Sequence, residues 1–291
     1  MADKLIKGIS EDKYIRFYAV DAIKTVKEAI KIHKLSVANS ILTGKLLLAG
    51  LMMSFDLKNK QDLLSIKLDC SGPTKGIITT VKNNGEIKCY INNPAAEFSK
   101  ETKSFKEFLQ DGTISVIKDL GLKEPYIGTI ELISGGIGDE MTHYYLKSEQ
   151  IHTAVSVGIM FNKDGSVKQA GGFVVQLLPF APEESISKLE ENLNFLPNIT
   201  DLLDMGHSIE EVIEKFVLKD IPSKIYETIE PKYFCDCSYE RFLKGISLLS
   251  ESELNEIIKD NEDIEVVCRF CNKKYTYSPE TILKIKQSKK H

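Results

Sequence analysis

The sequence predicts an α+β fold in three parts: an N-terminal domain of mixed sheet and helices, a helical linker, and a small C-terminal domain. Strand and helix patterns alternate as far as Pro179, acidic residues become abundant beyond it, and four cysteines gather near the C-terminal end. We place the three parts at residues 1–180, 181–230 and 231–291.

The N-terminal part carries most of the expected secondary structure. Residues 13–20 (KYIRFYAV) predict a strand, and Asn83–Gly85 and Lys163–Ser166 are typical of tight turns between paired strands. The remaining elements are helices expected at 21–33, 36–55 and 137–149, and strands expected at 63–70, 75–82, 85–91, 113–118, 126–134, 153–162 and 167–178.

The second part, residues 181–230, is strongly acidic, with 12 acidic and 4 basic side chains. Ser208 and Glu211 form a capping box at the start of a helical pattern. Apolar residues follow at helical spacing: Ile209, Val212, Ile213, Phe216 and Val217. We therefore expect amphipathic helices that bury one apolar face; an ordinary packed helical segment is the alternative to a docking role.

The chain has 6 cysteines, and they are unevenly distributed along it. Cys70 and Cys89 lie alone in expected strands, where a small apolar role is the simplest interpretation. The other four form two close pairs with 30 residues between them: Cys235, Cys237, Cys268 and Cys271. Four clustered thiols in a reducing compartment are typical of a tetrahedral zinc site. Cys-x-Cys is a less usual half-site than Cys-x-x-Cys, so unrelated buried or redox cysteines are the alternative.

The third part, residues 231–291, is small enough to need such a metal in order to fold. We expect helices at 238–248 and 250–259 and a strand at 264–268 between the two cysteine pairs. Four thiolates leave no open position for water, which disfavours hydrolytic zinc chemistry. A static structural clip and a redox switch both fit, because zinc-bound thiolates are also the species that oxidants attack. The residues alone favour the static clip.

Charge and motifs narrow the functional classes further. The net charge of −4 argues against a dedicated nucleic-acid binder. The alternative of a zinc-ribbon protein that binds nucleic acid or a partner rests on four lysines near the end of the chain: Lys284, Lys286, Lys289 and Lys290. The glycine-rich segment 134–138 lacks the phosphate-binding pattern, and no nucleophile elbow is present, so we expect no enzyme.

Membrane association is not expected. The most apolar stretch, Ile41–Met53, has 13 residues, whereas a spanning helix needs about 20. The N-terminal residues carry both charges and have no apolar segment of the secretory type, so we expect a cytoplasmic protein.

Several motifs, taken in chain order, resemble the redox-regulated 33-kDa heat-shock protein family, the bacterial holdase chaperones. The resemblance covers essentially the whole length. The segments that carry it are SGPTKGI (71–77), YINNP (90–94), KDLGLKEPY (118–126), SEQ (148–150), AGGFVVQLLP (170–179), FCDCSYERFLKGISLLSESELNEII (234–258) and IEVVCRFCNKKYTYSPETI (264–282).

The resemblance implies a function and a mechanism. The four clustered cysteines match the family's ligands for one zinc ion per chain in the reduced form. On oxidation, disulfides are implied between Cys235 and Cys237 and between Cys268 and Cys271. The linker is then implied to leave the first domain, so that unfolded client proteins bind the surface it exposes. The resemblance also implies that the active form is a homodimer and that it works without ATP. On this view Ile209, Val212, Ile213 and Phe216 serve in linker docking and client contact.

Overall fold

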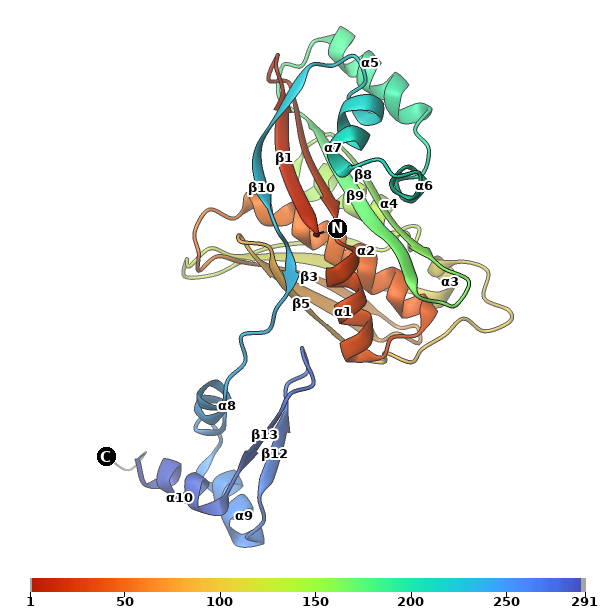
Figure 1. Ribbon diagram of the computed structural model, residues 1–291. Helices are drawn as coiled ribbons and strands as arrows, with labels where there is room; N and C mark the ends of the chain where they lie inside the picture. The colour runs from red at the N-terminus through yellow and green to blue at the C-terminus, as the bar shows by residue number, and fades with distance from the viewer. Residues whose placement is uncertain (1, 289–291) are drawn as a thin grey trace. The chain divides into compact units, whose positions relative to one another are not determined.

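The computed structural model describes residues 2–288. The chain divides after Phe234 into two units, Met1–Phe234 and Cys235–His291 (Figure 1). Both units combine sheet and helix, which confirms the predicted α+β class. Each unit is described by itself below.

The first unit contains two sheets. Sheet A is antiparallel throughout, in the order β10 (Ser223–Ile229), β1 (Lys4–Ser10), β2 (Ile15–Asp21), β9 (Val167–Leu177) and β8 (Thr153–Phe161). Sheet B has the order β11 (Lys232–Tyr233), β5 (Glu86–Ile91), β4 (Gly76–Lys82), β3 (Leu63–Cys70), β6 (Gly112–Asp119) and β7 (Tyr126–Glu131). All of its pairs are antiparallel except β11 with β5, which is parallel.

The helix α2 (Val37–Met53) fills the space between the two sheets and contacts strands of both. Of its 17 residues, 14 are buried. The segment Val37–Asp56 is long and apolar enough to cross a membrane, yet 83% of the 18-residue window that meets this test is buried inside the protein, as in a core helix. The shorter elements around this core are α1 (Ile23–His33), a 3-10 turn at Ser54–Asp56, α3 (Phe105–Leu109), α4 (Ile137–Tyr144) and a π-helical turn at Tyr145–Glu149.

A second apolar core lies on the opposite face of sheet A. Strands β1, β2 and β9 alternate side chains between the two faces, because successive residues of a strand point to opposite sides. Tyr18 and Val20 face α2, whereas Phe17 and Ala19 face outward. The outward set on the sheet consists of Ile6, Ile15, Phe17, Ala19, Phe173 and Val175, all at most 2% exposed. Sheet A is therefore apolar on both faces.

Helices from residues 183–217 cover this outward face (Figure 1). They are α5 (Glu183–Asn194), α6 (Ile199–Asp204), α7 (Ile209–Val212) and a π-helical turn at Ile213–Val217. The capping box expected at the start of α7 is present. The covering residues that are buried against the sheet are Leu189, Ile199, Leu202, Leu203, Ile209, Val212, Ile213, Val217, Leu218 and Ile221, with Phe216 half-buried. The predicted apolar stripe thus has a partner in the fold.

The last part of the acidic stretch differs from expectation. Helices were expected throughout 181–230, but residues 223–229 form strand β10, which pairs with β1. Most β10 side chains are exposed. Because neither face of the strand is buried along residues 224–228, selection for alternating apolar and polar residues is absent, and this alternation is the pattern that marks a strand in a sequence. Strand β1 was not expected either. Its adjacent apolar residues Leu5 and Ile6 face opposite cores and are flanked by lysines, so the sequence shows no alternation of apolar and polar residues. Sequence patterns also missed α3, the short β11, and β13 and α10 in the second unit.

The second unit is built around a short hairpin. Strand β12 (Ile264–Val267) pairs antiparallel with β13 (Lys274–Tyr277), and α8 (Tyr239–Ile246), α9 (Glu251–Asp260) and α10 (Pro279–Ser288) accompany them. In the described part of this unit, the hydrophobic core consists of five buried residues, and Cys268 is buried as well; the five are Ile246, Leu254, Tyr275, Tyr277 and Ile282. A core this small stabilises a fold weakly unless a metal or cross-link assists it.

Truncating a buried residue of the cover should loosen the helices without unfolding the sheets. We predict that Ile213→Ala weakens docking by about 2–5 kcal/mol, the usual cost of deleting a buried isoleucine side chain. Hydrogen exchange should then accelerate across residues 183–217 more than in sheet B. Glu214→Ala, an exposed neighbour, is the matched control. Equal protection in both variants would show that the helices do not depend on this contact.

Candidate metal centre

Two turns bring four thiols together in the second unit. Cys235 and Cys237 lie between β11 and α8, and Cys268 and Cys271 lie in the turn between β12 and β13. The latter turn is closed by backbone hydrogen bonds: the Cys268 amide donates to Lys273 O (2.9 Å) and the Asn272 amide donates to Cys268 O (2.7 Å). Asn272 adopts a left-handed conformation (φ 58°), which asparagine tolerates better than most residues. The turn therefore presents both thiols on one side.

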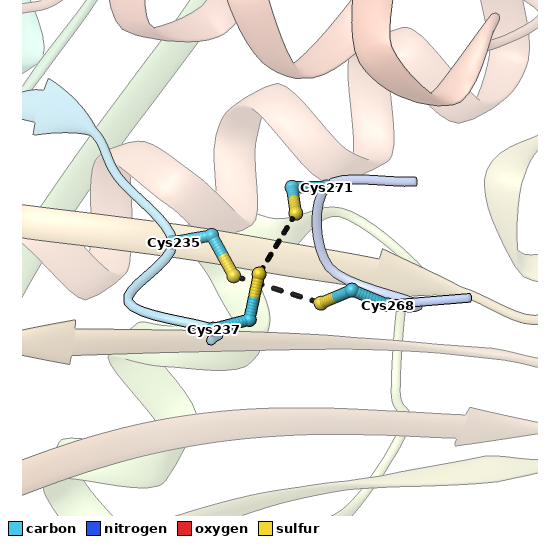
Figure 2. A group of neighbouring side chains, drawn as sticks. All are labelled: Cys235, Cys237, Cys268 and Cys271. Carbon is cyan, nitrogen blue, oxygen red and sulfur yellow. Dashed lines mark hydrogen bonds between the residues drawn. The ribbon is translucent and has the colours of Figure 1, made fainter. Parts of the chain in front are cut away.

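The four sulfurs form a compact group (Figure 2). All lie within 4.8 Å of one another, with 3.7 Å from Cys235 Sγ to Cys268 Sγ and 3.4 Å from Cys237 Sγ to Cys271 Sγ. Thiolates held at about 2.3 Å by a tetrahedral zinc ion would lie about 3.8 Å apart. All six cysteines of the chain are free thiols. The arrangement therefore fits a reduced site that could hold a metal ion.

The four thiols need a nearby positive charge if all of them are to ionise. Burial raises the pKa of the Cys235 thiol well above its usual value and that of Cys271 to about 11. Burial alone would also raise the pKa of Cys237, but a hydrogen bond from the Tyr275 hydroxyl and the neighbouring thiols lower it. Four thiols this close cannot all ionise without a compensating charge, which a bound dication supplies.

A second layer of residues holds the thiols in place. The Tyr275 hydroxyl lies 3.1 Å from Cys237 Sγ and donates to Cys237 O at 2.9 Å. Arg241 forms an ion pair with Asp236, the residue between the first two cysteines (3.1 Å). Sequence reasoning missed Tyr275, whose only signal is its position four residues after Cys271 in an aromatic strand.

Basic residues near the second cysteine pair and near the end of the chain interact with neighbouring side chains. Lys274 pairs with Glu265 on the neighbouring strand at 2.9 Å, so part of its charge is neutralised. Lys273 lies 5.3 Å above the Tyr275 ring. In the C-terminal lysine group, Lys286 forms an ion pair with Glu251 (3.6 Å). Lys289 and Lys290 lie outside the described residues.

The two remaining cysteines lie elsewhere. Cys89 is fully buried on β5, and burial raises the pKa of its thiol to about 12. Cys70 is half-buried at the end of β3, where burial also raises its pKa. Both fit the small apolar role expected from the sequence, and neither lies in the four-thiol cluster.

A tyrosine two residues before the cluster anchors the chain to sheet B. The Tyr233 hydroxyl lies 2.9 Å from His33 Nε2 on α1, accepts from the Cys89 amide (3.3 Å) and donates to Cys89 O (3.2 Å). The Phe234 amide donates to Ile87 O (2.9 Å) and Lys232 pairs with Glu86 (3.1 Å). Nothing in the local sequence indicates this anchor, because its partners are far away in the chain.

The fold and the cluster together define a two-unit α+β protein with a covered apolar sheet and a thiol centre suited to a metal ion. The model of the Hsp33 protein family matches residues 3–278. The chain belongs to the Hsp33 family.

Relatives and a solved structure agree with this assignment. The "33 kDa chaperonin" of Agathobacter rectalis is 38% identical over 97% of this chain and 99% of its own length. The protein of the same name from Clostridium tetani is 38% identical over 97% of each chain. The crystal structure of the 33 kDa chaperonin from Thermotoga maritima superposes with a TM-score of 0.88 at 28% identity and covers 99% of both chains.

Loss of one thiol of the cluster should abolish tight metal binding. Mutation of a residue that only hydrogen-bonds to a metal ligand typically lowers metal affinity by roughly 10–100-fold. We predict that Cys237→Ser, which removes a ligand itself, lowers zinc affinity by more than this. Its second unit should lose hydrogen-exchange protection, while sheet B keeps its own. Cys70→Ser is the control and should retain one zinc per chain. Full zinc content in Cys237→Ser would show that the cluster is not the binding site.

Proposed function

We propose that this protein is an ATP-independent holdase chaperone whose client binding is gated by zinc and by thiol oxidation. The reduced, zinc-bound chain is inactive, and the oxidised chain binds unfolded proteins and prevents their aggregation. The observation that carries the proposal is the four-thiol cluster in a unit whose described residues form a core of five buried side chains. The names of the curated relatives, 33 kDa chaperonin, support the chaperone class.

Zinc is the metal that suits the donor set best. Four thiolates in a closed tetrahedral shell are typical of structural zinc sites, and they leave no position for substrate. Cys235, Cys237, Cys268 and Cys271 would hold the ion, one per chain. A structural zinc ion contributes about 10–16 kcal/mol of folding free energy in small domains. The second unit would then depend on the thiols remaining reduced.

Oxidation would remove all four ligands in two steps. We propose disulfides between Cys235 and Cys237 and between Cys268 and Cys271, the pairs that are closest in sequence. Formation of each disulfide removes two electrons from a pair of thiolates; one molecule of hydrogen peroxide accepts these electrons together with two protons from solvent and becomes two molecules of water. Disulfide sulfurs cannot replace thiolate ligands, so the zinc would be lost and the second unit destabilised.

The chain itself connects the cluster to the cover of sheet A. Cys235 follows directly after residues 223–234, which we call the strap. The strap consists of β10 and β11, and it joins the covering helices to the first thiol pair. The end of the strap at Tyr233 is followed directly by the second unit. When that unit unfolds, this end is joined to a disordered segment instead of a folded one. The strap would then separate from its neighbouring strands, first β11 from β5 and then β10 from β1, until the covering helices are reached.

Release of the cover would create the client-binding surface. The outward face of sheet A presents Ile6, Phe17 and Phe173, which are buried beneath the helices. The helices carry Ile209, Val212, Ile213 and Phe216, which would also be free to contact a client. An exposed apolar surface of this kind binds non-native chains, and the acidic residues would keep the released linker in solution. We place the protein in the cytoplasm and expect the oxidised form to be a homodimer, as in the resembling family.

The proposal is tested by measuring zinc and chaperone activity on one preparation. The reduced protein should hold one zinc ion per chain and leave the light scattering of a thermally unfolding client unchanged. After hydrogen peroxide treatment, it should lose zinc and suppress the scattering. If zinc survives oxidation, or its loss leaves scattering unchanged, the centre is a static clip.

The anchor at Tyr233 should set how readily the strap is released. Tyr233→Phe removes the hydroxyl that bonds to the His33 ring and to the Cys89 backbone, at a cost of about 1–3 kcal/mol. We predict unchanged zinc content when reduced, faster hydrogen exchange in residues 223–234, and activation at lower peroxide concentration. Tyr226→Phe removes a hydroxyl from an exposed side chain of the same strap and is the control. Identical behaviour of both variants would contradict a role for the anchor.

A further inference from the structure

Strand β10 covers the edge of β1 mainly through its backbone. It pairs antiparallel with β1 from Leu5↔Ile229 to Ser10↔Ser223. The side chains of residues 224–228 are exposed, and even Tyr226 is 53% exposed. Ile229, at the end of the strand, packs against the core beneath α2, but the rest of β10 buries little side-chain surface in this pairing. Another extended segment could make the same backbone contacts with a different sequence.

The pairing of β10 is also irregular. Lys7 pairs with Glu227 and Gly8 pairs with Ile225, so Tyr226 has no partner across the strand. A Cβ atom on Gly8 would lie 2.5 Å from the Lys224 carbonyl oxygen, so the close approach of the two backbones requires glycine here. Such a bulge disrupts the ladder locally. The one ion pair between the strands, Lys7 with Glu227 at 3.8 Å, is partly exposed and adds little.

Strand β1, in contrast, is firmly part of the sheet. It pairs with β2 without a break from Lys4↔Asp21 to Ile9↔Arg16. Leu5 is fully buried in the core beneath α2, and Ile6 is fully buried on the outward face. If β10 leaves, β1 stays in place and becomes an edge strand with unpaired N–H and C=O groups. Ile6 then lies beside Phe17 on the apolar face that the helices had covered.

We infer that the uncovered edge of β1 is a client-binding site, and that its occupant is an extended segment of a non-native protein. The segment adds to β1 in place of β10, over about the same 7 residues. Backbone hydrogen bonds give sequence-tolerant affinity, and alternate apolar side chains of the client pack beside Ile6 on the outward face. This inference rests on the proposed function, because β10 must first be released.

The test uses a labelled synthetic peptide of the β10 sequence, SKIYETI, and the full-length protein. The peptide should bind the oxidised protein, compete with a thermally unfolded client, and not bind the reduced zinc-bound protein. A set of peptides with one N-methyl group each then probes the backbone. Because alternate amides of a strand face its neighbour, affinity should fall about tenfold at some positions and hardly change at the adjacent ones.

The outcomes separate this inference from the function on which it rests. Equal affinity for every N-methylated peptide would show that binding runs through side chains and would overturn the inference. So would an oxidised protein that suppresses aggregation but does not bind the peptide; the chaperone function would then stand. If the oxidised protein does not suppress aggregation and its β10 amides stay protected from hydrogen exchange, both proposals fail.

Discussion

Apolar side chains on both faces of sheet A impose the constraint on which the rest of the structure depends. One face packs against α2, and the other carries a second complete set of buried residues, including Phe17 and Phe173. A sheet of this kind cannot leave its second face in water without a large loss of hydrophobic stabilisation. The covering helices supply that burial, and they come from the part of the chain that leads to the thiols.

The thiol unit has the opposite difficulty, since it has too little apolar surface to bury. Five buried residues and a short hairpin leave a metal as the natural source of its stability. The strap, residues 223–234, joins this thiol unit to the cover of sheet A, and hydrogen bonds to Tyr233 fasten its end. A change in the oxidation state of four sulfur atoms can thereby be linked to the exposure of a large apolar surface.

Sequence patterns predicted the parts of this arrangement that depend on local side chains. Alternating residues indicated β3 and β4 nearly to the residue, and the spacing of the cysteines indicated one cluster. Patterns failed where pairing runs through the backbone, as in β10, or where a short charged strand lies between two neighbours, as in β1. They also could not find Tyr275 or Tyr233, because a hydroxyl acquires its partners only when distant segments fold together.

If the thiol cluster controls the cover of sheet A, oxidation must change hydrogen exchange in both. Exchange would be followed by mass spectrometry in the reduced zinc-bound protein and again after peroxide treatment, with sheet B as the internal reference. We expect residues 183–229 to lose protection together with the second unit, while β3 and β4 keep theirs. If the second unit loses protection but residues 183–229 do not, the cluster and the cover are independent, and the thiols do not control exposure of sheet A.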